Sequence, residues 1–213
     1  MRVLSPIVLL SASTTALSFS PLAAPAVSRA AFISTPLRMG LVSSLFGMAS
    51  GSYAAPVVMG DEALMSAKAH GTSAMPVQSN LRWSCDGKTA DRICNFNRHY
   101  AEHSGYWETT SFLSEETQSA DKEINFYDSN TGDLLFVAPR GRSWDSFVRE
   151  SKSHGWPSFR DEEVVWDKMR VLPGGEAVST AGTHLGHNLP DGSGNRYCIN
   201  LVSVAGRPKE EAK

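Results

Sequence analysis

The chain has 213 residues, which suits one ordinary domain with additional segments or two small domains, and excludes a repeat array and a large multidomain enzyme. Its 20 Lys and Arg residues against 22 Asp and Glu residues give a net charge of −2, so no broad basic surface for nucleic acids is expected. Three cysteines without a Cys-x-x-Cys pair argue against a disulfide scaffold and against a four-cysteine zinc site.

The first 60 residues differ in composition from the rest of the chain. They contain three arginines and no Asp, Glu or Lys, so residues 61–213 carry a net charge of −5. Residues 1–18 have a basic start, an apolar run (3–10) too short to span a bilayer, and small residues at 16–18 suited to cleavage. This pattern predicts a secretory signal peptide over residues 1–18.

Residues 19–60 begin with Phe19 and are rich in Ser, Ala and Pro, which is typical of a transit peptide followed by a linker. A signal peptide followed directly by a transit peptide resembles the bipartite leaders of algae with secondary plastids. The resemblance implies the plastid (chloroplast) stroma as the location, with the secretory pathway or the thylakoid lumen as alternatives. No membrane span is expected in the mature protein, and its folded part is expected to begin between Asp61 and Gln78.

The folded part is expected to open with an N-terminal extension over residues 61–122, in which 95–106 are a candidate helix at the edge of a sheet. A domain over 123–206 follows. Its first β-rich runs predict a hairpin with Gly132 in the turn, over residues 124–127 and 134–137. Ser143 then caps a predicted amphipathic helix that stops near Gly155.

The remaining elements of the domain are mostly strands. The charge run 160–163 is expected to be a solvated loop, and residues 207–213 a disordered tail. Strands are predicted over 164–166, 169–172, 176–179 and 197–204, with a glycine turn between the second and third.

Residues able to carry chemistry are concentrated in the last sixty positions. A cysteine near imidazoles can be a nucleophile, because an imidazole or an arginine lowers the pKa of the thiol and the thiolate is the reactive form. Arg196 and Asn200 each lie two residues from Cys198, and alternate strand residues share a face. The informative strings are His154-Gly-Trp-Pro-Ser-Phe159, Gly182-Thr-His-Leu-Gly-His187, Pro190-Asp-Gly192 and Arg196-Tyr-Cys-Ile-Asn200.

In this order and spacing, the four strings resemble the B-type methionine-R-sulfoxide reductase family over roughly residues 123–205. The resemblance implies a mainly β fold of two twisted antiparallel sheets with a few peripheral short helices. It also implies an oxidoreductase that repairs oxidised proteins by reducing their methionine-R-sulfoxide. The roles implied are Cys198 as nucleophile, His184, His187 and Asn200 around the sulfoxide oxygen, Trp156 as the wall for the substrate methyl group, and Phe159 and Arg196 in substrate binding.

The implied reaction proceeds through a sulfenic acid on Cys198, with an imidazolium protonating the sulfoxide oxygen. No bound cofactor is expected, and an external thiol reductant, thioredoxin or glutathione with glutaredoxin, regenerates the thiol. The expected partners are therefore oxidised proteins and that reductant, and the protein is expected to be a monomer.

Two departures from the family pattern concern zinc and recycling. Most members carry two Cys-x-x-Cys pairs for a structural zinc, but the corresponding stretches, 128–131 and 179–182, contain no cysteine, so zinc is not expected. The usual resolving cysteine ahead of the Gly-Trp-Pro-Ser-Phe string is also absent. Cys85 and Cys94 leave three alternatives open: they pair with each other, one of them resolves the sulfenic acid on Cys198, or both are inert.

Two other classes of function stay open at this point. A catalytically inactive relative would use the same pocket for binding, or act as an accessory subunit in the plastid. A metal-binding β protein would use His184, His187 and Cys198 as ligands. His99 and His103, four residues apart on the candidate helix, are expected to be solvated surface residues.

Overall fold

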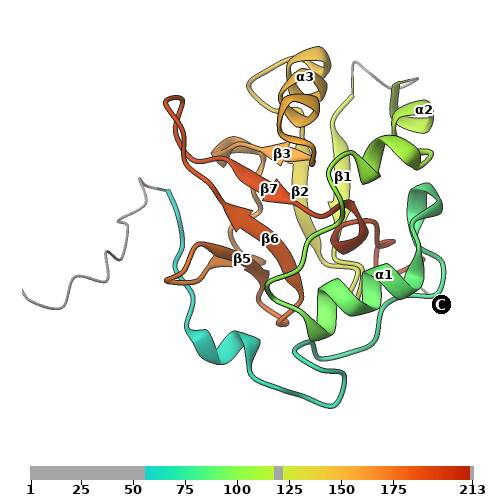
Figure 1. Ribbon diagram of the computed structural model, residues 1–213, viewed down its shortest axis with the longest axis vertical. Helices are drawn as coiled ribbons and strands as arrows, with labels where there is room; N and C mark the ends of the chain where they lie inside the picture. Colours follow the sequence, from blue (N-terminus) through green and yellow to red (C-terminus); the bar gives the residue numbers. More distant parts are fainter. Residues whose placement is uncertain (1–55, 118–121, 212–213) are drawn as a thin grey trace, which may run out of the picture. The chain divides into compact units, whose positions relative to one another are not determined.

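Two antiparallel β-sheets organise the part of the chain that the computed structural model describes, residues 56–117 and 122–211. The predicted signal peptide and almost all of the predicted transit peptide and linker lie outside these residues. The larger sheet has the strand order β3-β7-β6-β5-β4, and the smaller is the β1–β2 hairpin (Figure 1). The strands are β1 (Ile124–Tyr127), β2 (Leu134–Ala138), β3 (Ser158–Phe159), β4 (Met169–Val171), β5 (Glu176–Ser179), β6 (His184–Asn188) and β7 (Tyr197–Ile199).

Helices in the described residues are short, and α3, with 11 residues, is the longest of them. Within the described ranges, no helix combines the length and apolar character needed to cross a bilayer. The prediction of a mainly β fold with two antiparallel sheets and short helices is confirmed. The helices are α1 (Gly87–Asp91), α2 (Phe112–Glu116) and α3 (Trp144–His154), the π-helical turn η3 (Arg92–Phe96), and the 3-10 turns η1 (Glu62–Met65), η2 (Arg82–Ser84), η4 (Tyr106–Thr109), η6 (Asp161–Glu163) and η7 (Leu201–Ser203).

The predicted hairpin and the predicted amphipathic helix are both confirmed. Gly132 has φ 70° in the β1–β2 turn, a conformation that glycine adopts without steric cost. The side chain of Ser143 accepts a hydrogen bond from the backbone N–H of Ser146 and so caps α3. Gly155, in the left-handed region, ends the helix. These elements follow from local sequence signals alone.

Aromatic side chains from distant parts of the sequence form the core. The rings of Trp83 and Phe112, both from the predicted N-terminal extension, lie 4.8 Å apart in an edge-to-face pair. Phe112 also packs on Phe126 of β1 and Trp144 of α3. Because these side chains are all buried in one cluster, the extension helps to form the core of the domain as well as covering it.

Three predicted elements differ from the structure. The predicted helix over 95–106 does not form, because residues 97–105 between η3 and η4 are not helical. The segment 164–166 makes a single bridge, from Val164 to Phe136, in place of a strand. The last strand ends at Ile199, because η7 turns the chain away from the sheet immediately after Asn200. Strands β3 and β6 were not expected, since their Ser, His and Gly content carries little β-propensity.

Both ends of the described chain pair with the domain. The backbone N–H of Val171 donates to the carbonyl of Val58, and the N–H of Gly60 donates back to Val171, so the end of the predicted linker pairs with the edge strand β4. The N–H of Arg207 donates to the side chain of Gln78, and Lys209 pairs with Asp133. Residues 58–60 and 207–209 are thus tied to the domain, which differs from the linker through residue 60 and the disordered tail from 207 that the sequence predicts.

The pairing of β6 with its two neighbours decides which side chains share a face. Cys198 on β7 lies opposite His187 on β6. On the other side of β6 the register shifts by one residue, so that Val178 of β5 pairs with His184. Residues three apart in a regular strand point to opposite faces, but this bulge allows the rings of His184 and His187 to approach to 6.0 Å between centroids.

Gly186, between the two histidines, allows β6 and β7 to approach closely. A Cβ atom at this position would lie 2.0 Å from the backbone carbonyl oxygen of Cys198. We therefore expect Gly186→Ala to force the strands apart and to lower the free energy of unfolding, measured with urea, by about 1–3 kcal/mol. Gly192→Ala is the matched control, because nothing lies within 4 Å of a Cβ added there. Equal stabilities of the two variants would contradict the close approach.

Candidate functional site

A cavity of about 180 Å³ brings together five of the residues that the sequence singles out. It opens beside β6 and β7 and is closed on one side by residues 99–101, which follow η3. The side chains from predicted positions are Trp156, His184, His187, Cys198 and Asn200; the others lining the cavity are His99, Tyr100, Ala101, Gly186 and Leu189.

The thiol of Cys198 is partly buried, and its charged neighbours oppose the effect of burial. Burial raises the pKa of Cys198, while Arg196 lowers it by its charge and by a hydrogen bond from Nη1 to Sγ at 3.4 Å. Ser158, directly opposite Cys198 on β3, also lowers the pKa. The net direction is upward, so the thiol, rather than the thiolate, is the resting form at neutral pH.

Arg196 is held against Cys198 by a series of ion pairs. Its Nε donates to Asp191 Oδ2 at 3.2 Å. Asp191 also accepts two hydrogen bonds from Arg160, at 2.9 and 3.1 Å, and these bonds are the main reason that the pKa of Asp191 falls to about 2. Because Arg160 pairs in turn with Glu150 on α3, the guanidinium beside the thiol is fixed by contacts reaching to a helix on the sheet edge.

The charged residues 160–163 take part in the same network of ion pairs, so they do not form the solvated loop that the sequence predicts. Glu163 is fully buried and pairs with Arg142, and Arg142 also pairs with Glu150. Burial of Glu163 is possible because the guanidinium of Arg142 reaches it from the turn before α3. The acidic pattern in the sequence did not indicate these partners.

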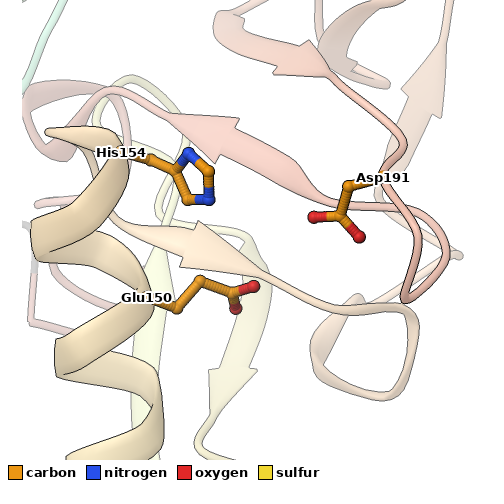
Figure 2. Close-up of side chains that lie close together, drawn as sticks. All are labelled: Glu150, His154 and Asp191. Carbon is orange, nitrogen blue, oxygen red and sulfur yellow. The ribbon is translucent and has the colours of Figure 1, made fainter.

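Glu150, His154 and Asp191 lie close enough to share a metal ion. Figure 2 shows the side chains of Glu150 and His154 on α3 and that of Asp191 across from them. Their potential ligand atoms lie within 4.8 Å of one another. Both carboxylates, however, already accept hydrogen bonds from the guanidinium of Arg160. A cation bound there would have to displace that guanidinium, so the geometry fits an ion-pair cluster better than a metal centre.

The two predicted histidines occupy different environments. His184 is 1 % exposed, and its ring faces the backbone of Ile93, an interaction that favours the protonated form. Burial lowers its pKa to about 4, with the carboxylate of Glu176 opposing in part. Burial lowers the pKa of His187 as well, and Glu176, opposite His187 in the β5–β6 pairing, again opposes. Both imidazoles are therefore largely neutral at neutral pH.

The segment 97–103, part of the candidate helix predicted over 95–106 at the edge of a sheet, closes one side of the cavity. Arg98 anchors it, because Nε donates to Glu176 Oε2 at 2.7 Å. His99 is 81 % exposed at its side chain but lines the cavity, with Nδ1 3.8 Å from Glu176 Oε1. His103, predicted to be solvated, is indeed exposed. No motif marks this segment, since its contacts are made across long sequence separations.

Glu102 in this segment contacts two of the predicted site residues. Its backbone N–H donates to Asn200 Oδ1 at 2.9 Å, and its carbonyl accepts a hydrogen bond from Trp156 Nε1 at 3.1 Å. The Asn200 amide group also donates to the carbonyl of Leu185 at 2.9 Å. The orientations of both side chains thus depend in part on the backbone of Glu102, which lies outside the sequence motifs.

Phe159 lies away from the cavity, contrary to its predicted role in substrate binding. It is fully buried and stacks on Phe136 with ring centroids 4.3 Å apart. The reason is strand alternation: Ser158 is the residue of β3 that lies opposite Cys198, so the next side chain points to the core. Arg196, by contrast, lies against the thiol, although it does not line the cavity.

The two other cysteines are free thiols that lie outside this cavity. Cys94 is fully buried, with Sγ 3.5 Å from the hydroxyl of Ser203. Cys85 lines a separate depression with residues 76–81. Burial raises the pKa of both thiols strongly. The structure therefore contains no Cys85–Cys94 disulfide, and it places neither thiol beside Cys198.

The stretches that correspond to the zinc pairs of the related family do not suit the metal. Residues 128–131 and 179–182 offer no thiol or imidazole, and hydrogen bonds join the two turns. Asp128 Oδ1 accepts from the hydroxyl of Thr183 at 3.0 Å and from the backbone N–H of Asn130 at 2.8 Å. Both turns therefore lack the soft thiolate ligand set that a structural zinc site needs.

The contact between Arg196 and Cys198 can be tested by alkylation. Arg196→Met should raise the pKa of Cys198 further, since the neighbouring cation favours the thiolate. We expect iodoacetamide labelling of Cys198 at pH 8, followed by peptide mass spectrometry, to slow about three- to tenfold. Arg149→Met, at an exposed position of α3, removes the same charge without touching the thiol. Equal slowing in both variants would show that the net charge of the protein, and not the contact of Arg196 with Sγ, sets the reactivity of Cys198.

Comparison with characterised proteins gives several relatives, all named peptide methionine sulfoxide reductase MsrB. The chain is 31% identical over 99 residues to the protein from Methanosarcina barkeri, covering 41% of this chain and 69% of that relative. For the protein from Methanosarcina mazei the identity is 33% over 97 residues, covering 40% of this chain and 68% of that relative. For Leifsonia xyli it is 35% over 68 residues, covering 27% of this chain and about half, 49%, of the relative.

No protein-family model matches the chain, and no solved structure matches it. The two Methanosarcina proteins nevertheless share 31% and 33% identity with the chain over alignments that cover more than two thirds of their own length. Together with the mainly β fold, this similarity shows that the chain belongs to the MsrB family of peptide methionine sulfoxide reductases.

Proposed function

We propose that this protein reduces methionine-R-sulfoxide in proteins to methionine, through a sulfenic acid on Cys198. The relatives are named as reductases of peptide methionine sulfoxide. The observation that carries the proposal is the cavity in which Cys198, His187 and Trp156 face one space. A thiol nucleophile, a proton carrier and an apolar wall are the groups that this reduction needs.

The proton balance of the reaction is met within the cavity. The sulfoxide sulfur gains two electrons and its oxygen is transferred to Sγ of Cys198, so the thiol proton must leave sulfur and the oxygen must be protonated. His187 lies opposite Cys198 in the strand pairing, and its lowered pKa makes it a neutral base in the resting protein. Neutral His187 accepts the thiol proton and then, as imidazolium, donates it to the sulfoxide oxygen.

Arg196 and Trp156 have complementary roles in this proposal. The guanidinium of Arg196 stabilises the thiolate as it forms, since its Nη1 already contacts Sγ. The indole of Trp156 offers an apolar face to the methyl group on the substrate sulfur, a contact worth about 0.3–1.5 kcal/mol. Asn200 and the buried His184 line the same cavity and orient the sulfoxide oxygen.

Recycling needs two thiols from outside the cavity. A first external thiol attacks the sulfenic acid to release water and form a mixed disulfide, and a second releases Cys198 and leaves with the oxidised reductant. We propose a reductant of the thioredoxin type, or glutathione with glutaredoxin. Cys85 and Cys94 lie outside the cavity, which supports an external route over an internal resolving thiol.

A catalytically inactive relative is the second candidate. It is favoured by one observation, the raised pKa of Cys198, which leaves little thiolate at neutral pH. We place it second because Arg196 and Ser158 both favour the thiolate, and because His187 can remove the thiol proton during the reaction.

We further propose that the protein works without zinc, as a monomer in the plastid stroma of an alga with a secondary plastid. The zinc-free state is supported by the absence of cysteine from residues 128–131 and 179–182, and by the hydrogen bond from the Thr183 hydroxyl to Asp128 Oδ1 that joins the two turns. The location is supported by the composition of residues 1–60, nearly all of which lie outside the described structure.

The proposed activity is tested with the two epimers of a dabsylated methionine sulfoxide. Purified protein with dithiothreitol should reduce the R epimer and leave the S epimer, and Cys198→Ser should abolish turnover, because serine cannot form the sulfenic acid. His187→Asn should lower kcat by about 10²- to 10⁴-fold, the range for loss of a general acid or base. Absence of R-epimer turnover by the unsubstituted protein would leave the inactive relative as the remaining candidate.

The two remaining cysteines should not matter when dithiothreitol is the reductant. Cys85→Ser and Cys94→Ser are expected to keep near-normal turnover of the R epimer, because dithiothreitol reaches Cys198 through the open cavity. With thioredoxin in place of dithiothreitol, a selective loss in one variant would identify an internal resolving thiol and contradict the external route. Unfolding in urea checks that the buried Cys94 substitution leaves the fold intact.

A further inference from the structure

We propose that Glu102 is a positioning residue for this reduction, which holds Trp156 and Asn200 in place and does so only while its buried carboxyl is neutral. The inference rests on the proposed function and names a means of regulating the same site. Glu102 belongs to no motif of the sequence, and it lies in the segment that closes the cavity.

Glu102 holds the site residues through its backbone. Its N–H donates to Asn200 Oδ1 at 2.9 Å, and its carbonyl oxygen accepts from Trp156 Nε1 at 3.1 Å. One peptide segment therefore fixes the indole on one wall of the cavity and the carboxamide on another. A displacement of residue 102 would release both side chains together.

The side chain of Glu102 fixes that backbone in position. Only 4 % of the residue is exposed, and Oε1 accepts a hydrogen bond of 2.5 Å from the backbone N–H of Val202. The backbone N–H of Leu201 also bonds to this carboxyl. Residues 201 and 202 follow Asn200 directly, so the carboxyl and the N–H of Glu102 hold the same short stretch from both sides.

The surroundings of the carboxyl suit its neutral form. Its second oxygen, Oε2, is buried without a hydrogen-bond partner, and within residues 56–117 and 122–211 no Lys, Arg or His side chain acts on its charge. The titratable groups that face it are the thiols of Cys85 and Cys94 and the phenol of Tyr106, whose pKa values its charge would raise. None of these groups is a cation, so a carboxylate there lacks a compensating charge.

Burial raises the pKa of Glu102 from 4.5 to about 7, although the N–H groups of Val202 and Leu201 favour the charged form. Because the pKa of Glu102 is higher when the segment 97–103 is packed on the cavity, the carboxyl stabilises this packed position less as pH rises. The stabilisation begins to fall near pH 4.5, the pKa of a solvated glutamate, and is fully lost above about pH 7. The segment 97–103 should therefore hold Trp156 and Asn200 firmly in mild acid and more loosely in base.

Two substitutions separate the charge from the packing. Glu102→Gln keeps an acceptor for Val202 and imitates the neutral carboxyl, so KM for the R-sulfoxide should stay low from pH 5.5 to 8. In the unsubstituted protein KM should rise by about tenfold over that range. This is within the limit for a single titrating group, which can change an equilibrium by at most about tenfold for each pH unit between 5.5 and its pKa near 7. Glu102→Ala removes the contact and should raise KM by about tenfold at every pH while lowering kcat less. Glu108→Gln, at an exposed carboxylate nearby, is the matched control and should behave as the unsubstituted protein.

Amide hydrogen exchange of peptides covering 97–105 and 199–205 provides a readout that needs no turnover. After correction for intrinsic rates, protection in both peptides should fall between pH 5.5 and 8 in the unsubstituted protein, persist in Glu102→Gln and be lost in Glu102→Ala. If no variant reduces the sulfoxide but exchange follows this pattern, the reductase assignment fails and the positioning role stands. The proposal is overturned if Glu102→Gln shows the same pH dependence of exchange and KM as the unsubstituted protein. Should Glu102→Ala fail to fold, the Gln comparison decides alone.

Discussion

The pairing of β6 with β7 is the constraint on which the rest of the site depends. It sets His187 opposite Cys198, and it is possible only because Gly186 presents no side chain to the Cys198 carbonyl. The bulge on the other side of β6 then turns His184 toward His187. Backbone hydrogen bonding, with one register shift, thus places a thiol and two imidazoles around one cavity without any direct bond between their side chains.

Burial and charge act against each other throughout this site. Burial favours the neutral thiol and neutral imidazoles, while Arg196 favours the thiolate. The position of Arg196 depends on Asp191, which is held by Arg160 and through it by α3. The site can therefore hold a proton on sulfur at rest and still stabilise the charge that develops when the proton moves.

The segment 97–103 shows why part of the site was not predictable. Its residues contact β5, the turn at Trp156 and the start of η7, all more than fifty positions away in the sequence. Local periodicity carries no information on such contacts, and the candidate helix over residues 95–106, which would carry His99 and His103, does not form. The same limitation explains Phe159 and the buried Glu163, whose positions follow from strand alternation and from the partner Arg142.

The sequence alone determined the class of fold, the β1–β2 hairpin, the capped helix α3, the family, and the identities of Cys198, His184, His187, Asn200 and Trp156 as candidates. These follow from short-range signals, glycine and serine at helix and turn ends and strings of adjacent residues, which require no knowledge of distant contacts. Only the tertiary structure decided which wall closes the cavity, which guanidinium lies against the thiol, and which cysteines lie outside the cavity. Those outcomes depend on strand register and on ion pairs between residues far apart in the chain, which a linear pattern does not encode.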